Sequence, residues 1–124
     1  MSFSSEVDKA TENIMKSAER KVRGTLLSIF GRTITRTPIK SGRLRNNWHT
    51  EINKQAGGGI RKANRSGAQS VANATTKVKN LKMGDTVYFS NNMPYAYIIE
   101  HGHHSKQAPR GMLRVSIKEA GLKK

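Results

Sequence analysis

The chain lacks cysteine and long apolar runs, and it has few aromatic residues. Without any Cys among 124 residues, disulfide bonds and thiolate metal sites are excluded. No apolar run approaches the roughly 18 residues that span a bilayer, and the N-terminus does not have the pattern of a secretory signal. We therefore expect a soluble protein made in a cytoplasm. Apolar residues make up 35% and aromatic residues 6%, which suits one modest core in a single domain, residues 1–124.

Acidic groups are also scarce, whereas basic groups are abundant. The chain has 23 Lys and Arg against 8 Asp and Glu, a net charge of +15. More than half of this excess lies in residues 41–83, which carry nine basic groups and one acidic group. Such a field attracts polyanions, above all nucleic acid, without reading their sequence. A solvated basic surface that only aids solubility is an equally good interpretation.

Apolar spacing predicts one long N-terminal helix. Ser4 or Ser5 can cap it, Gly31 is expected to bend or end it, and the chain should leave the helical region by Pro38. We expect its apolar stripe to be the main core element, with a zipper against a partner helix as the alternative. The stripe recurs at spacings of three and four residues through Val7, Ala10, Ile14, Ala18, Val22, Leu26, Ile29 and Phe30.

The middle of the chain predicts two strands and a second helix. Alternation in residues 48–53 predicts a strand with Trp48 as a core anchor, and residues 86–90 suit a second strand. Ser66 and Gln69 have the spacing of a capping box for a helix running to about Lys79. Its weak apolar face is expected to hold Ala68, Val71, Ala72 and Val78.

These elements together predict an α+β fold. A long N-terminal helix and a second helix should pack on a small, mainly antiparallel sheet, followed by a short C-terminal helix. The residues expected to anchor the core are Leu44, Trp48, Phe89 and Ile99.

Residues 55–65 predict a flexible basic loop, because three consecutive glycines, 57–59, maximise backbone freedom. The loop lacks the Gly-Lys-Ser/Thr ending of a phosphate-binding loop, which argues against nucleotide binding. Its basic side chains could face DNA or an adjacent protein, or could simply be solvated. The residues concerned are Lys54, Arg61, Lys62 and Arg65.

Residues 91–112 contain three of the four histidines and two of the three tyrosines. A short helix after Pro94, ending before Gly102, is the preferred interpretation, although Tyr-Ala-Tyr-Ile-Ile also suits a strand. The last segment, from Met112, is interpreted as a helix.

This histidine-rich segment offers little catalytic chemistry. His101 and His103 could chelate a metal only with ligands from elsewhere, and His49 is the one other histidine. No nucleophile elbow surrounds Ser105, and no carboxylate pair is placed for acid–base work. We expect neither an enzyme nor a bound metal or cofactor.

Several short motifs, in their joint order, resemble the neck and tail-completion proteins of long-tailed bacteriophages. The resemblance covers residues 38 to about 117, and departs from the family in the extra histidine at 104 and in the short C-terminal end. The motifs are Pro38-Ile39-Lys40-Ser41-Gly42-Arg43-Leu44-Arg45-Asn46-Asn47-Trp48, Asn92-Met93-Pro94-Tyr95-Ala96, Ile99-Glu100-His101-Gly102-His103 and Gln107-Ala108-Pro109-Arg110-Gly111-Met112.

The resemblance implies an α+β virion protein at the head–tail junction, made in the host bacterial cytoplasm. Such proteins form rings, commonly hexamers, around the DNA channel. They contact head-completion, portal-side or tail-tube proteins, and non-specific contact with phage DNA is compatible with the basic charge. No membrane is involved.

Polar-tipped aromatic and hydrogen-bonding side chains suit contacts between subunits or rings. On this basis, we expect such contacts at Tyr95, Tyr97, Glu100, His103, Ser105 and Gln107, with ordinary core packing as the alternative for Tyr95 and Ile99. The alternative function is a sequence-independent nucleic-acid-binding protein that acts outside any virion.

Overall fold

The computed structural model describes residues 3–101 and 105–121. The element order is α1 (Phe3–Arg36), the short 3-10 helix η1 (Arg45–Asn47), β1 (Trp48–Ile52), α2 (Ala68–Lys79), β2 (Val87–Asn91), α3 (Ala96–His101) and α4 (Leu113–Glu119). The strands form a two-stranded antiparallel sheet in which Trp48 lies opposite Asn91 and Ile52 opposite Val87. The predicted α+β arrangement, with its long first helix and short last helix, is confirmed.

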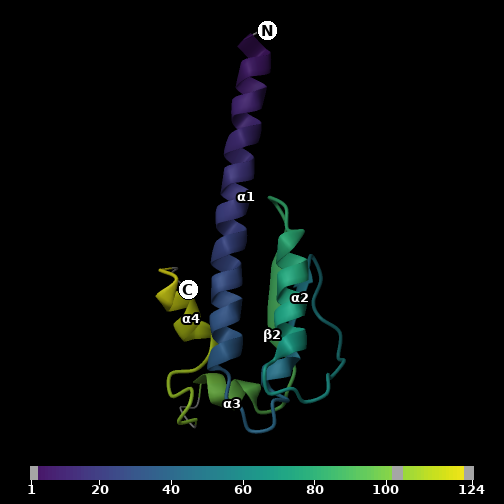
Figure 1. Cartoon of the computed structure of the whole chain (residues 1–124), viewed down its shortest axis with the longest axis vertical. Coiled ribbons are helices and arrows are strands. Elements are labelled where there is room, and N and C mark those ends of the chain that lie inside the picture. Colours follow the sequence, from purple (N-terminus) through teal and green to yellow (C-terminus); the bar gives the residue numbers. More distant parts are fainter. Residues whose placement is uncertain (1–2, 102–104, 122–124) are drawn as a thin grey trace.

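Helix α1 has two halves with different surroundings. Its second half is flanked by α2 and α4, whereas its first half projects beyond the rest of the molecule (Figure 1). Ile29, Phe30 and Ile34 are buried, but every described side chain from residue 6 to residue 16 is exposed. The prediction that the whole apolar stripe forms the core is therefore wrong for its first half, because no other element reaches that far.

The helix also continues beyond Gly31, which neither bends nor ends it. Packing of α2 and α4 against this part of α1 outweighs the low helix propensity of glycine and threonine. The hydroxyls of Thr33 and Thr37 donate to the carbonyls of Ile29 and Thr33, each at 2.7 Å. The helix ends at Arg36, just before Pro38, as Pro38 predicts.

Three aromatic rings join the helix to the sheet. Phe89 of β2 stacks on Phe30 of α1 with ring centroids 4.0 Å apart, and on Trp48 of β1 with centroids 4.7 Å apart. The indole N–H of Trp48 donates to Thr37 Oγ1 at 2.9 Å, so the buried ring leaves no unmet donor. Leu44 and Trp48 are buried in the core, and Phe89 and Ile99 are partly buried against it.

Helix α2 does not begin with the predicted capping box. Ser66 Oγ bonds to Asn64 instead, and the residue before the helix, Gly67, has a left-handed φ of 68°. The cap comes from outside the helix, because Asn46 Oδ1 accepts hydrogen bonds from the backbone N–H groups of Gln69 and Ser70.

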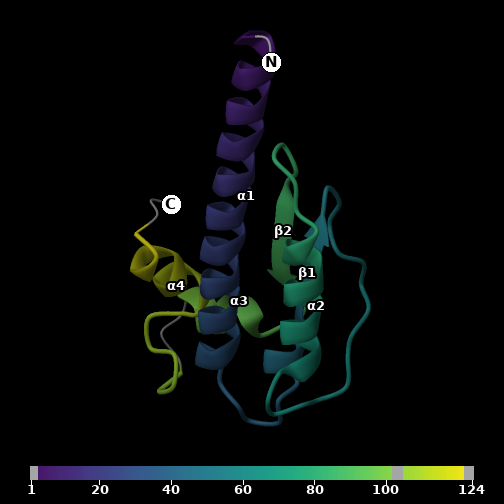
Figure 2. The same cartoon turned by 45° about the horizontal axis from the view of Figure 1, so that its top comes forward.

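The buried face of α2 also differs from the prediction. Ser70, Ala74 and Val78 face inward, whereas the side chains of Ala68, Val71 and Ala72 are exposed. The reason is the outer edge of β1, whose polar backbone groups need partners. Ser70 Oγ accepts from Trp48 N at 3.0 Å and Asn73 Oδ1 accepts from Thr50 N at 2.8 Å. Figure 2 shows α2 lying alongside the sheet at this edge.

Candidate interaction surfaces

Arg61 lies at the centre of a polar cluster between η1, β1 and α2. Its guanidinium donates to the carbonyls of Asn46 at 3.0 Å and Trp48 at 2.9 Å, and to Asn73 Oδ1 at 3.0 Å. Burial lowers the pKa of Arg61 from its usual value. The donors of Arg61 thus bind groups within the subunit and its side chain is only partly exposed, while a role for it in facing DNA or an adjacent ring stays a prediction.

The glycine-rich loop is held in place along its second half. Asn92 Nδ2 donates to Gly59 O at 2.7 Å, and Arg61 N donates to Asn47 Oδ1 at 2.7 Å. Asn64 N donates to Gly42 O at 3.2 Å. The loop predicted to be flexible throughout is therefore anchored from Gly59 onward.

Three basic side chains of this region remain directed to solvent. Lys54, Lys62 and Arg65 are exposed, on the loop that runs beside α2 in Figures 1 and 2. They can meet an anion without disturbing the fold. A role for them in facing DNA or an adjacent ring stays a prediction.

Arg45 binds the carbonyl groups at the end of α1. Its Nη2 donates to Thr35 O at 2.7 Å and to Thr37 O at 2.8 Å, and its Nη1 donates to Arg65 O at 3.2 Å. Burial, followed by the nearby charge of Arg65, lowers the pKa of Arg45. Carbonyls at a helix C-terminus have no partner within the helix, and the guanidinium group of Arg45 supplies the missing hydrogen-bond donors.

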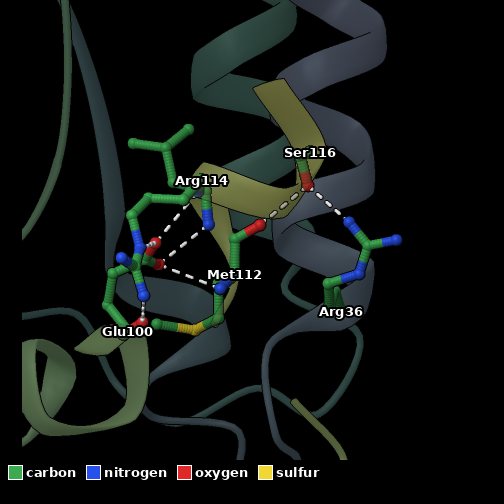
Figure 3. A network of polar contacts seen from close by, with 6 residues as sticks. Arg36, Glu100, Met112, Arg114 and Ser116 are labelled. Carbon is green, nitrogen blue, oxygen red and sulfur yellow. Dashed lines mark hydrogen bonds and ion pairs between the residues drawn. The ribbon is translucent and has the colours of Figure 1, made fainter. Parts of the chain in front are cut away.

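Glu100 caps the N-terminus of α4 (Figure 3). Its carboxylate accepts from the backbone N–H groups of Met112 at 2.9 Å, Leu113 at 2.8 Å and Arg114 at 2.9 Å. Burial alone would raise the pKa of Glu100, but these backbone donors and the charge of Arg114 outweigh burial and lower it. Gly111 must be glycine here, because its φ is 95° and a Cβ would lie 2.5 Å from Glu100 O.

Glu100 is therefore engaged inside the subunit rather than between subunits. Gln107 is engaged too, since its Oε1 accepts from Ile39 N at 3.1 Å. Ser105 Oγ accepts from the N–H groups of Gln107 and Ala108, each at 3.2 Å, in a local turn. These three side chains make contacts within the chain, and their expected contacts with a neighbouring subunit stay predictions. His103 lies outside the described residues.

The two tyrosines are expected contact residues with exposed side chains. Tyr97 is 73% exposed and Tyr95 is 39% exposed, and Ile98, which follows Tyr97, is 51% exposed. Tyr95 also lines a hollow of about 470 Å³ together with Pro38, Lys40, Ser41, Gly42, Leu44 and Ile99. An exposed aromatic and aliphatic group beside an apolar hollow is a surface suited to another protein.

The described part of the chain offers no site for metal chemistry. No group of three or more His, Cys, Asp or Glu residues is placed to hold an ion there, and His104 lies outside it with His103. Burial and then the charge of Arg61 lower the pKa of His49, and this lowering is partly offset by Glu51 and Asn92.

Among residues 3–101 and 105–121, none of the helices is long and apolar enough to cross a membrane.

Comparison with known proteins finds no match among protein-family models, curated proteins or solved structures. The function must therefore be inferred from the placement of the residues of this chain. Two surfaces stand out, namely the exposed tyrosines of the α3 region and the projecting half of α1.

Proposed function

We propose that this chain is a ring-forming subunit at the head–tail junction of a long-tailed bacteriophage, as a neck or tail-completion protein. One observation carries the proposal. The motifs that resemble this family contain several of the buried side chains and hydrogen-bonding groups that hold the fold together. Arg45, Trp48 and Glu100 are the clearest examples, because Arg45 and Trp48 bind the end of α1 and Glu100 caps α4.

The glycines in these motifs support the same conclusion. Gly42 has a φ of 84°, and a Cβ there would lie 2.4 Å from Arg65 N. Gly111 is restricted in a similar way by Glu100. A chain with the same motifs in the same order would therefore meet the same steric demands and be expected to share this fold. The step from fold to function is an analogy with the family that the motifs resemble.

The surface is compatible with a ring on a DNA channel. The exposed side chains of Lys54, Lys62 and Arg65 could face the passing polyanion, which would bind them weakly and without sequence preference. The exposed Tyr95 and Tyr97 would then contact protein neighbours.

The direct test is to remove the gene from the phage and to image the particles formed. The expected result is DNA-filled heads and tails that do not join. In complete particles, the protein should lie at the junction in a copy number that matches a ring. Joined, infectious particles without the protein would overturn the proposal.

The nucleic-acid-binding alternative rests on the net charge of +15. This alternative requires that the protein is absent from phage particles. It also requires that particles assemble normally without the protein. Binding of DNA by the purified protein at low salt does not separate the two functions, since a chain of this charge binds polyanions in either case.

The basic loop can be tested within the proposed function. Replacing Lys54, Lys62 and Arg65 by Gln should reduce DNA delivery while particles still join. The matched control replaces three other exposed lysines, Lys79, Lys106 and Lys118, by Gln. If both triple variants behave alike, total charge rather than the loop is responsible.

A further inference from the structure

The acidic side chains are divided unequally between two parts of the molecule. We call residues 3–19 of α1 the arm and residues 20–121 the body. The arm carries four of the eight acidic residues and only two basic ones, a net side-chain charge of −2. The remainder of the chain, residues 20–124, carries 21 basic and four acidic side chains, a net charge of +17. The arm is thus a negative segment at one end of a strongly positive protein.

The carboxylates of the body are already engaged. Glu51 lies 3.3 Å from Lys77 Nζ and Glu119 lies 2.8 Å from Arg36 Nη2. Asp85 accepts from Lys82 N at 2.9 Å, and Glu100 caps α4. Each of these four carboxylates therefore has a partner within the subunit.

The carboxylates of the arm are less engaged than those of the body. Glu6 and Asp8 have no hydrogen-bond or ion-pair partner among residues 6–101 and 105–121. Glu12 pairs with Lys16 at 3.0 Å, but both side chains are more than 60% exposed and such a surface pair contributes little. Glu19 pairs with Arg23 at the junction with the body.

An apolar stripe lies beside these carboxylates. Ile14 is 69% exposed, Met15 48% and Val7 45%, and the stripe continues through Val22 toward the buried Ile29. Val7, Ile14 and Ala18 share one face at the helical period, and Asp8, Glu12 and Glu19 follow an adjacent row. The buried Phe30 lies five helical turns beyond Glu12, so the row of carboxylates is in line with the face that α1 buries in the body, and the apolar stripe lies beside that face.

We propose that the arm of one subunit docks on the basic body of a second copy of this chain. The apolar stripe would be buried in this contact, and the row of carboxylates would meet lysines and arginines of the neighbouring body. This inference rests on the proposed function, because it supplies the contact that would link subunits into a ring.

Net charge favours this contact over the simplest alternative, a contact between two arms. Two arms side by side would bring like charges together, which is unfavourable, whereas an arm on a body joins −2 to +17. An arm-to-body contact is also heterologous, so repeating it generates a closed ring when the rotation between subunits closes. Salt screens both this attraction and the repulsion between the two positively charged bodies.

The test uses Ile14→Asp in the full chain, with Asn13→Asp as the control. Both variants add one carboxylate to the exposed arm, but only Ile14 belongs to the apolar stripe. Sedimentation over a concentration series should show that wild type and Asn13→Asp associate alike. Ile14→Asp should associate at least about tenfold more weakly, because the isoleucine side chain that the proposed contact would bury is replaced by a charge. Circular dichroism should show the same helix content in all three proteins.

If Ile14→Asp and wild type have the same assembly state at every concentration, the arm contact does not exist. This result would leave the proposed function standing if particles still depend on the protein. Conversely, normal particles without the protein would overturn the function while the arm contact could still be measured in solution.

Cross-linking locates the contact. The chain has no Cys, so Ile14→Cys introduces a single thiol. With a thiol-to-amine cross-linker and a mixture of isotope-labelled and unlabelled protein, links should join residue 14 of one copy to body lysines of another. Disulfides between two copies of residue 14, with no links from residue 14 to body lysines of another copy, would overturn the proposal in favour of a contact between two arms.

Discussion

The side-chain oxygen of Asn46 lies 3.0 Å from the backbone nitrogen of Gln69, 23 positions later in the chain, and caps helix α2 from a separate element. The amide nitrogen of Asn46 donates to Lys62 O at 2.9 Å and also contacts Gln69 Oε1. One fully buried side chain therefore joins η1, the basic loop and the start of α2.

Replacing Asn46 by Ala should destabilise the fold by about 2–3 kcal/mol, because buried backbone N–H groups lose their acceptor. Urea unfolding measures this as a lower midpoint. Asn80→Ala is the control, since Asn80 is exposed and its side chain makes one local bond to Thr76 O. Equal midpoints for the two variants would show that Asn46 does not act as the cap.

Gly42→Ala should be among the most damaging single changes. A left-handed φ alone costs a non-glycine residue about 1–2 kcal/mol, and the new Cβ would also lie 2.4 Å from backbone atoms of Asn64 and Arg65. Gly57→Ala, where nothing lies within 4 Å, should leave the melting temperature nearly unchanged. A well-folded Gly42→Ala protein with wild-type stability would contradict the close approach of these two segments.

Replacing Glu100 by Gln should reduce the loss of folding stability that occurs when the pH becomes acidic. Because the pKa of Glu100 is lowered in the folded state, its carboxylate stabilises the fold at neutral pH. This contribution is lost as pH falls from the ordinary glutamate pKa of about 4.3 through the lower folded value. Glu100→Gln should be about 2 kcal/mol less stable than wild type at pH 7. This difference in stability should be smaller below the pH range that separates the two pKa values.

Thermal melts of both proteins from pH 7 to pH 3 would measure this effect of Glu100→Gln. Glu6→Gln, on the exposed arm, should melt like wild type at pH 7. A constant difference between wild type and Glu100→Gln at all pH values would mean that the carboxylate charge is not what stabilises α4.

Arg45→Lys should lower stability by about 1–3 kcal/mol, because an ammonium cannot reproduce the fork that holds Thr35 O and Thr37 O. Arg43→Lys is the matched control, because Arg43 is two residues away and exposed. Denaturant unfolding compares them. If both changes cost the same, the carbonyls at the end of α1 are satisfied without Arg45.

Periodicity in the sequence was sufficient to predict most of the elements. Strong local signals, such as the apolar spacing before Phe30 and the strand-forming residues 86–90, correspond to α1 and β2. The extent of α1 and its burial could not be predicted in the same way. An apolar stripe looks the same whether its partner is the rest of the chain or another molecule, and only the tertiary fold shows that residues 6–16 have no neighbour.

The polar residues were harder to interpret from sequence. Ser66 and Gln69 have the spacing of a cap, but Asn46 from another element takes that role. Arg61 in a glycine-rich basic loop suggests a solvent-facing charge, yet it is held by buried carbonyls. Long-range hydrogen bonds leave no periodic pattern. The one available signal was the cluster of Arg45, Asn46 and Asn47 directly before the buried Trp48.

The stacked rings of Phe30, Phe89 and Trp48 have a consequence for how the body loses its structure. Phe89 packs against both apolar clusters of the core, one around Ile34 and Met112 and the other around Ile29 and Val78. Neither cluster can loosen without disturbing the shared ring, so the body should unfold in a single cooperative transition. Trp48 is the only tryptophan in the chain and lies at one end of the stack. Its fluorescence therefore reports on both clusters at once, and the protein carries a built-in optical probe of its own folding.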